Sequence, residues 1–243
     1  MEDLPRIKPM GERALLLDFE PEISEVLLEK LLFLKDYIEQ NLVKQKVEVI
    51  NTYHSLLVDY QNGIEDIYSE ISSIKRLLRE AKVRNKKLNE IFHIPVCYDL
   101  TLGLDLEYLS LEKKLSIEEI ISLHTAPVYT VFFSGFLPGF LYLGGLDEKL
   151  FFQRKEKPRM KVEKGAVGIG EKQTGIYPQT SPGGWQIIGN SPVPLFDPTS
   201  NPPCEISAGS KIKFYAVHPG EFQKISEEVR TGEFKWKKEP WNG

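Results

Sequence analysis

The sequence predicts an α+β protein with two consecutive domains, residues 1–93 and 94–243. In the first domain, short apolar runs alternate with longer stretches whose apolar residues recur at helical spacing. In the second, short runs rich in Val, Ile and Tyr are separated by Gly and Pro, as is typical of a small barrel or sandwich. A chain of 243 residues is long enough for one large domain or two small ones, with a core in each.

The elements of the first domain follow one another in a regular order. The run at 14–19 (ALLLDF) predicts a strand, and a helix follows it. Strands at 47–51 and 55–60 are separated by a gap short enough for a hairpin. A second helix comes next, and the run at 88–94 predicts a last strand. This β-α-β-β-α-β order is typical of a ferredoxin-like sandwich.

The second domain is predicted to begin with two short helices, at 105–115 and 116–124. Ser116 and Glu119 have the spacing of a capping box, in which a hydroxyl and a carboxylate satisfy free backbone N–H groups. Strand-like runs then dominate, and the stretch 221–230 predicts a helical tail.

Composition excludes several classes of partner. The net charge is −4, and Lys and Arg are scattered among Asp and Glu, so we expect no nucleic acid partner. The N-terminus lacks the pattern of a signal peptide, and no apolar run is long enough to cross a bilayer, so we expect a cytoplasmic protein without membrane contact. Cys97 and Cys204 are predicted to be reduced thiols, and without a Cys/His cluster we expect no zinc.

The glycine-rich segment at 165–173 (GAVGIGEKQ) does not match a phosphate-binding loop. Glu171 stands where Lys is needed, and Gln173 stands where Ser or Thr would hold magnesium. Neither GxSxG nor HExxH occurs, which disfavours an independent hydrolase of those types. Any ATP bound by this chain must therefore be held by another geometry.

Several long motifs in a fixed order carry a family resemblance. They are FSGFLPGFLYLGGLDEKL, PRMKVEKGAVGIGEKQTGIYP, SPGGWQIIGNSP and LFDP, preceded by IPVCYD and EEIISLHTAP, and they cover most of residues 94–217. In these motifs the chain resembles the allophanate hydrolase subunit 1 family, which includes the 5-oxoprolinase subunit PxpB and the kinase inhibitor KipI. The resemblance implies a cyclophilin-like β-barrel for residues 94–243 and agrees with a ferredoxin-like first domain.

The resemblance also implies a reaction. It is the ATP-dependent opening of 5-oxoproline to L-glutamate, with ADP and phosphate as the other products, shared with A-type and C-type subunits. In that case the chain would be inactive alone, ATP would be shared with a partner, and no metal would be expected beyond the Mg²⁺ that accompanies ATP. One departure concerns Asn190, which stands where the family more usually has Arg, so a family contact to an anion would lose its charge here.

The same resemblance leaves two alternatives. One is a KipI-like inhibitor of the autophosphorylation of a sensor histidine kinase, for which Trp236 or Trp241 would be candidate anchors. The other is half of a urea-carboxylase-type carboxyltransferase. It ranks lowest because the sequence contains no biotin-carboxylase segment and no Met-Lys biotin-attachment pair.

His124 is the candidate catalytic residue. Its ordinary pKa lies near working pH, and it ends a predicted helix just ahead of the aromatic segment, so it is suited to proton transfer. The alternative is a helix-capping histidine with no part in catalysis.

Five further residues are candidates for binding substrate. The planar fork of Arg159 suits a carboxylate or phosphate, although an internal ion pair is as plausible. Gln173, Thr174 and Tyr177 offer neutral donors and acceptors for an amide or anion edge. Trp185 follows two glycines and could form an apolar wall for a ring, with burial in the core as the alternative.

Overall fold

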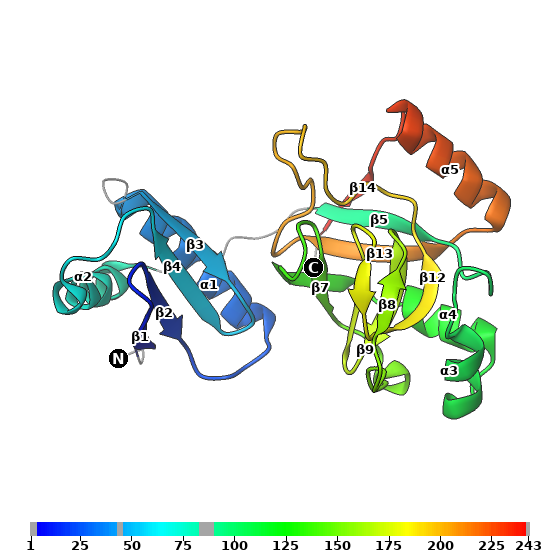
Figure 1. Cartoon of the computed structure of the whole chain (residues 1–243), viewed down its shortest axis with the longest axis horizontal. Helices are drawn as coiled ribbons and strands as arrows, with labels where there is room; N and C mark the ends of the chain where they lie inside the picture. Colours follow the sequence, from blue (N-terminus) through cyan, green and yellow to red (C-terminus); the bar gives the residue numbers. More distant parts are fainter. Residues whose placement is uncertain (1–3, 43–45, 83–89, 242–243) are drawn as a thin grey trace. The chain divides into compact units, whose positions relative to one another are not determined.

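The computed structural model describes residues 4–42, 46–82 and 90–241. The chain divides into two compact units, Met1–Lys87 and Leu88–Gly243, which are described separately (Figure 1). Both units contain helices and strands, which confirms the predicted α+β class. None of the described helices has the length and apolar character needed to cross a bilayer.

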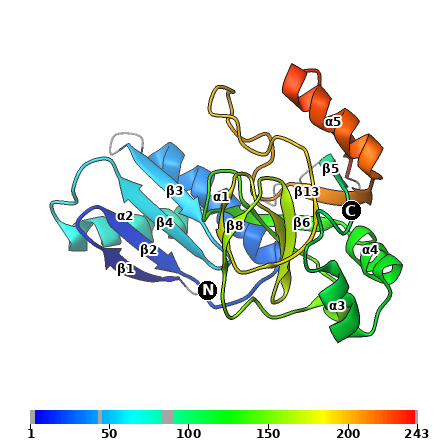
Figure 2. The same ribbon diagram turned by 45° about the vertical axis from the view of Figure 1, so that its right-hand side comes forward.

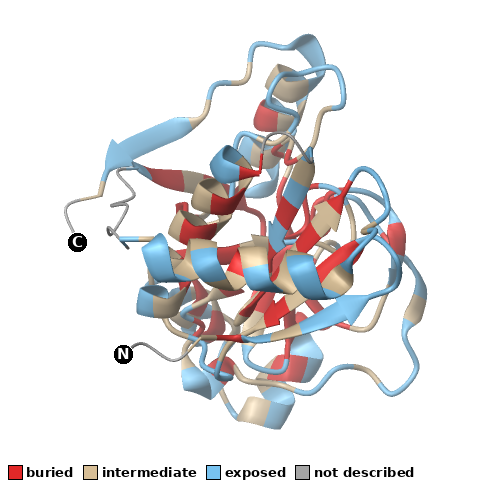
Figure 3. Cartoon of the chain, turned by 90° about the vertical axis from the view of Figure 1, so that its left-hand side faces the viewer, coloured by how far each residue is buried: buried red, intermediate tan, exposed pale blue. Residues whose placement is uncertain are grey.

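The first unit is an antiparallel four-stranded sheet packed with two helices. Its strand order is β1-β2-β4-β3, and alternate residues of β2 and β4 face the helices, so Leu15, Leu17, Leu56 and Val58 are fully buried. Figure 3 colours the chain by burial, and buried and exposed segments alternate along its helices. Ser24 caps the first helix through its hydroxyl, and Asp66 caps the second through its carboxylate. The elements are β1 (Arg6–Met10), β2 (Ala14–Asp18), α1 (Glu25–Asn41), β3 (Val47–Asn51), β4 (Ser55–Tyr60) and α2 (Ile67–Glu80).

The last strand predicted for this unit belongs to the other one. β5 (Glu90–Val96) pairs in parallel with β13 (Lys211–Ala216), so the division of the chain falls at 87/88 and not at 93/94. The edge of the first sheet is instead occupied by β1, which pairs with β2 from Arg6 to Met10. β5 is buried on both faces and lies in the interior of the eight-stranded sheet, with a strand at each of its edges.

The second unit is built on a sheet in the order β12-β9-β10-β7-β6-β13-β5-β14. β5 is followed by Cys97, which forms an isolated antiparallel bridge to Asn190 of β12, with N···O distances of 2.8 and 3.0 Å. One bridge therefore joins this strand to the far edge of the sheet, without a continuous closed ladder. The remaining strands are β6 (Tyr129–Ser134), β7 (Leu141–Gly144), β8 (Arg159–Val162), β9 (Ala166–Gly170), β10 (Gln173–Ile176), β11 (Ser181–Gly183), β12 (Gln186–Asn190) and β14 (Lys237–Pro240), and β8 and β11 form a separate pair.

The predicted helices of the second unit are confirmed. They are α3 (Leu106–Lys113), α4 (Ile117–Thr125) and α5 (Pro219–Thr231), and a 3-10 turn, η2, spans Glu148–Leu150. The capping box at the start of α4 is present, since Ser116 and Glu119 bond to each other's backbone N–H groups. α3 and α4 lie side by side, and α5 lies well away from them (Figures 1 and 2).

Candidate functional site

A small pocket with aromatic walls opens beside the loop between β6 and β7. Its volume is about 230 Å³. We call it the aromatic pocket; it is lined by Phe136, Phe140, Tyr142, Arg154, Pro158, Tyr177, Pro182, Gly183, Gly184 and Trp185. The structure therefore brings together two predicted substrate-binding residues, Tyr177 and Trp185, from segments on either side of β11.

Glycines make room for the rings of this pocket. A Cβ on Gly170 would lie 2.5 Å from Nε1 of Trp185, and a Cβ on Gly183 would lie 2.4 Å from the Tyr177 hydroxyl. Side chains cannot approach that closely, so these positions need glycine. The dense glycines of the sequence thus reflect close approach of backbone to aromatic side chains.

The rings stand edge to face. Phe140 meets Trp185 at a centroid distance of 5.4 Å and Tyr177 at 5.3 Å, and both ring pairs are close to perpendicular. Burial raises the pKa of Tyr177 and of Tyr142. Both phenols therefore stay neutral at physiological pH and can donate hydrogen bonds.

Arg154 places a cation at this pocket. Its guanidinium lies 5.8 Å from the centroid of the Trp185 ring, and its Nε lies 3.6 Å from a carboxylate oxygen of Glu171. Half of the Arg154 side chain is exposed. A guanidinium in this position can bind an anion while it remains packed on the indole.

Phe136 lies at the same pocket in an unusual backbone conformation. Its φ is +65°, in the left-handed region that disfavours residues with a side chain, and 63% of its surface is exposed. Its ring meets Phe140 edge-on at 5.6 Å. A strained and exposed aromatic residue beside a pocket is a common feature of ligand sites.

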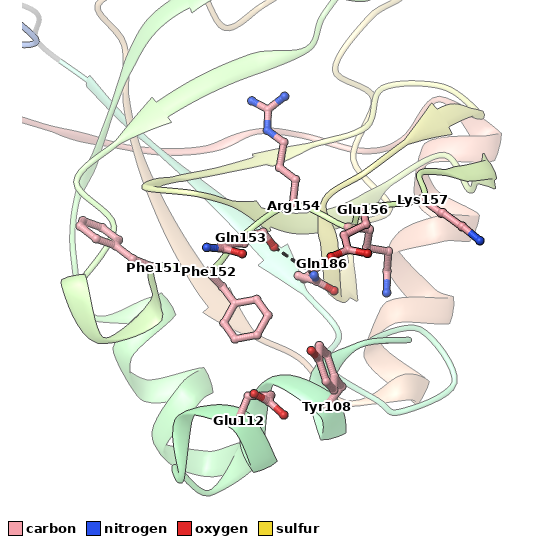
Figure 4. Close-up of a pocket in the computed structure, with 10 residues that line it drawn as sticks. Tyr108, Glu112, Phe151, Phe152, Gln153, Arg154, Glu156, Lys157 and Gln186 are labelled. Carbon is pink, nitrogen blue, oxygen red and sulfur yellow. Dashed lines mark hydrogen bonds between the residues drawn. The ribbon is translucent and has the colours of Figure 1, made fainter.

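A second cavity, larger than the aromatic pocket, lies next to it and shares Arg154 with it. Its volume is about 630 Å³, and we call it the polar cavity; its lining is Tyr108, Glu112, Phe151, Phe152, Gln153, Arg154, Lys155, Glu156, Lys157 and Gln186 (Figure 4). Arg154 lines both cavities, and in Figure 4 its side chain points away from the other residues drawn. Trp185, just before β12, lines the aromatic pocket, whereas Gln186, the first residue of β12, lines the polar cavity.

Gln186 is almost fully buried, with 3% of its surface exposed. Its amide Nε2 donates to the carbonyl of Gln153 at 3.0 Å. Its Oε1 has no hydrogen-bond partner among the described residues. This carbonyl oxygen is an acceptor without a donor, which is costly in a folded protein.

Arg159 does not line either cavity. Both of its terminal nitrogens donate to the carboxylate of Asp105, at 2.7 and 2.8 Å. The same carboxylate accepts from Lys155 Nζ at 2.7 Å and from the backbone N–H of Ile187 at 2.7 Å. The internal ion pair, one of the two interpretations of Arg159, is therefore what the structure contains, and binding of substrate by Arg159 stays a prediction without geometric support.

His124 lies in the core with no exposed surface. Thr174 Oγ1 donates to the carbonyl of Gly168 at 3.0 Å, so it must accept the N–H of His124 Nε2 at 2.9 Å. The other ring nitrogen, Nδ1, then accepts from the hydroxyl of Tyr98 at 2.7 Å. Burial lowers the pKa of His124 to about 3, so the ring is neutral.

Two other predicted substrate-binding residues, Thr174 and Gln173, lie outside both cavities. Thr174 is fully buried as the partner of His124 and lines neither cavity. Gln173 is half-buried at the β9–β10 turn, opposite Gly170, and lines neither cavity either. A catalytic role for His124 stays a prediction, but a sealed, neutral imidazole is poorly placed to exchange protons with a bound substrate.

Sequence reasoning missed Arg154 as a site residue. It also left Phe136, Phe140 and Tyr142 as unassigned members of an aromatic run. A signal was available, because this run is the densest aromatic segment of the chain and the charged segment RKEKPR follows it closely. Within the ranges 4–42, 46–82 and 90–241, no group of three or more His, Cys, Asp or Glu side chains is placed to hold a metal ion.

Comparison with known proteins adds an independent observation. The family model for the carboxyltransferase domain, subdomains C and D, matches residues 5–206. The B subunit of the 5-oxoprolinase of Bacillus subtilis (strain 168) is 36% identical over 233 residues, which cover 92% of this chain and 97% of that protein.

Solved structures agree on the fold. The structure of TTHA0988 matches with a TM-score of 0.74 and 30% identity, covering 85% of this chain but only 40% of that longer chain. The urea amidolyase of K. lactis matches with a TM-score of 0.80 over 99% of this chain and 17% of its own, and at 18% identity this likeness shows the fold alone.

Proposed function

This chain belongs to the carboxyltransferase domain family of subdomains C and D, and on that premise we propose that it is a subunit of an ATP-dependent 5-oxoprolinase. Such an enzyme converts 5-oxoproline, ATP and water into L-glutamate, ADP and phosphate. The similarity to the B subunit of a 5-oxoprolinase along nearly its whole length supports this assignment. The chain then works as one component of a multi-subunit hydrolase.

The chemistry of this reaction sets what the active site must bind. The amide of an unstrained five-membered lactam is a poor electrophile with a poor leaving group. Transfer of a phosphoryl group to its oxygen makes the carbonyl carbon open to attack by water, and positive charge or donors near the developing negative charge lower the barrier. The site must therefore hold a small ring and a polyphosphate together.

The observation that carries the proposal for this chain is the aromatic pocket. It combines apolar rings with one half-exposed guanidinium, from Arg154, which suits a small anionic ring compound. We propose that it is this chain's share of a site that a partner chain completes. C-type and A-type subunits of 5-oxoprolinase are the partners that we propose.

The polar cavity is a poor cradle for the phosphates of ATP. Among its three basic residues, Lys155 is already bonded to Asp105. Glu112 and Glu156 place carboxylates in the same lining. Negative charge there would repel a polyphosphate. We therefore assign the phosphates, with any accompanying Mg²⁺, to the partner chains, and we place no reaction step in this cavity.

For the architecture, we propose that the second unit is a cyclophilin-like barrel. The bridge between Cys97 and Asn190, which links the strand after β5 to β12, supports this description. We also propose that the first unit is a ferredoxin-like variant in which β1 takes the place of the C-terminal edge strand. The order β1-β2-β4-β3 with two helices supports it.

Neither alternative function gains support from a specific observation in this chain. One proposed anchor for a histidine kinase, Trp236, packs edge-on against Phe92 at 5.7 Å and contributes to the core. The family model fits a carboxyltransferase role, but the similarity to a 5-oxoprolinase B subunit runs along nearly the whole of both chains, whereas this chain covers only 17% of the urea amidolyase. We therefore retain the 5-oxoprolinase proposal.

Reconstitution tests the proposal. The purified chain alone should show negligible 5-oxoproline-dependent ATP hydrolysis, measured as coupled release of ADP and glutamate. Addition of purified C-type and A-type subunits from the same genome should restore both products in equal amounts. Full turnover by the isolated chain would contradict the shared site, and an inactive three-subunit mixture would contradict the function itself.

A further inference from the structure

We infer that the aromatic pocket binds the lactam ring of 5-oxoproline against Trp185 and Phe140, with the carboxylate of the substrate on the guanidinium of Arg154. This inference rests on the proposed function and adds to it the place and orientation of the substrate. It is carried by the size of the pocket, by its rings, by the charge of Arg154 and by the position of Phe136.

The size of the pocket selects a small ligand. Its volume of about 230 Å³ is below the range of roughly 300–1,000 Å³ that is usual for drug-sized ligands. A single five-membered ring with a carboxylate and a carbonyl oxygen suits this space. A nucleotide is too large to be enclosed by it, so the pocket favours the ring substrate over the nucleotide.

The rings define where the lactam lies. Phe140, Tyr177 and Trp185 stand nearly perpendicular to one another, so they form walls with different orientations. The methylene groups of the lactam can pack against such faces and edges, as aromatic side chains do among themselves. The buried phenols stay neutral and can donate to a carbonyl oxygen, and Tyr142 is the more exposed of the two.

The charge that meets the carboxylate belongs to Arg154. Its neighbour Arg159 has both terminal nitrogens engaged by Asp105. Arg154 is half exposed, and its contact with Glu171 involves Nε at 3.6 Å, longer than a hydrogen bond. The planar fork can therefore bind a substrate carboxylate by two parallel bonds.

Phe136 is placed to cover a bound ring. Its left-handed backbone conformation holds an aromatic side chain at the pocket with 63% of its surface exposed. The loop is anchored at Gly139, where a Cβ would lie 2.8 Å from Cβ of Phe196. Backbone strain of this kind persists only where the surrounding structure enforces it. The position of Phe136 at the pocket is therefore fixed by the fold.

The test uses the reconstituted three-subunit enzyme, with KM measured separately for 5-oxoproline and for ATP. Arg154→Ala should raise KM for 5-oxoproline at least tenfold and leave KM for ATP unchanged, and Arg154→Lys should fall between. Phe136→Ala should raise the same KM severalfold. Arg230→Ala, which removes an exposed arginine of α5, is the matched control and should change neither value.

A second substrate isolates the carboxylate contact. Pyrrolidin-2-one has the same lactam ring without the carboxylate, so the wild-type enzyme should prefer 5-oxoproline strongly over it. Arg154→Ala should lose most of this preference, because only the binding of the carboxylate is removed. A merely structural role for Arg154 would impair both substrates equally.

The outcomes separate this inference from the function on which it rests. An active wild-type enzyme whose KM for 5-oxoproline is unchanged by Arg154→Ala would overturn the inference and leave the function intact. Failure of the Arg154→Ala chain to co-purify with its partners would also overturn it, because Arg154 would then act in assembly and not in binding the substrate. An inactive wild-type mixture would remove the function as well.

Discussion

The carboxylate of Asp105 and the guanidinium of Arg159 form a bidentate ion pair, with N···O distances of 2.7 and 2.8 Å. Asp105 precedes α3 and its side chain is 4% exposed, whereas Arg159 begins β8. The carboxylate also accepts the N–H of Ile187 in β12. One buried acid therefore fastens a helix and two strands of the second unit to one another.

We predict that Asp105→Ala destabilises the protein. Burial alone would raise the pKa of Asp105, but hydrogen bonds from Arg159, Lys155 and Ile187 outweigh it and keep the pKa below its ordinary value. Removal of the carboxylate leaves these donors without their acceptor, at a cost of about 3 kcal/mol in the free energy of unfolding. Urea denaturation would measure it. Glu163→Gln, which breaks an exposed pair with Lys161, should cost under about 1 kcal/mol.

Stability should fall as the solution becomes acidic, and His124 should account for much of the slope. Its pKa is about 3 in the folded chain and about 6.5 when unfolded. Between these values the unfolded chain binds a proton that the folded chain refuses, so stability present above pH 6.5 is lost as the pH falls toward 3. The full loss is on the order of 5 kcal/mol.

The variant His124→Gln tests this origin. It removes the titrating ring, so its free energy of unfolding should depend less steeply on pH between 6.5 and 4 than that of the wild type. Where the His124→Gln variant is folded, the reconstituted enzyme should retain its kcat within a few-fold. A much larger loss of kcat would support a catalytic role for His124.

The glycines beneath the aromatic pocket should not tolerate a methyl group. Gly170→Ala brings a Cβ to 2.5 Å from Nε1 of Trp185, so either the backbone or the indole must shift. We expect a loss of about 1–3 kcal/mol in the free energy of unfolding, together with a red shift of the tryptophan fluorescence of the chain. Gly63→Ala, whose Cβ would meet its nearest neighbour at 3.8 Å, is the control. Equal stability of the two variants would contradict the tight packing around Trp185.

The sequence predicted most elements but not how they are shared between the units. Helical and strand periods located α1, α2, β2, β3 and β4, and the capping box located α4. β1 escaped because its sequence, RIKPM, is polar and mostly exposed, so it carries no apolar alternation. The partner of β5 escaped because period identifies a strand but not its neighbour.

The candidate site was predictable in part. Tyr177 and Trp185 were identified as candidate ring contacts and do meet in one pocket. Arg154 and Arg159 are alike in sequence, each a basic residue in a charged segment. Only three-dimensional proximity shows that Asp105, far from both in the chain, engages Arg159 and not Arg154. The burial of His124 could not be predicted for a similar reason, because a histidine at a helix end gives no sign of the Tyr98 and Thr174 side chains that enclose it.

The boundary between the units offers the last prediction. β5 pairs with β13 on one side and with β14 on the other, so it is an interior strand of the second sheet. We expect a fragment of residues 88–243 to fold alone, with a cooperative urea transition and dispersed amide signals in an NMR spectrum. A fragment of residues 98–243 lacks β5 and should be unfolded or aggregated, because β13 would lose its parallel partner and core residues such as Phe92 and Ile94 would be missing. Cooperative folding of the shorter fragment would contradict the placement of β5, and the sheet pairing that defines the second unit would then need another strand.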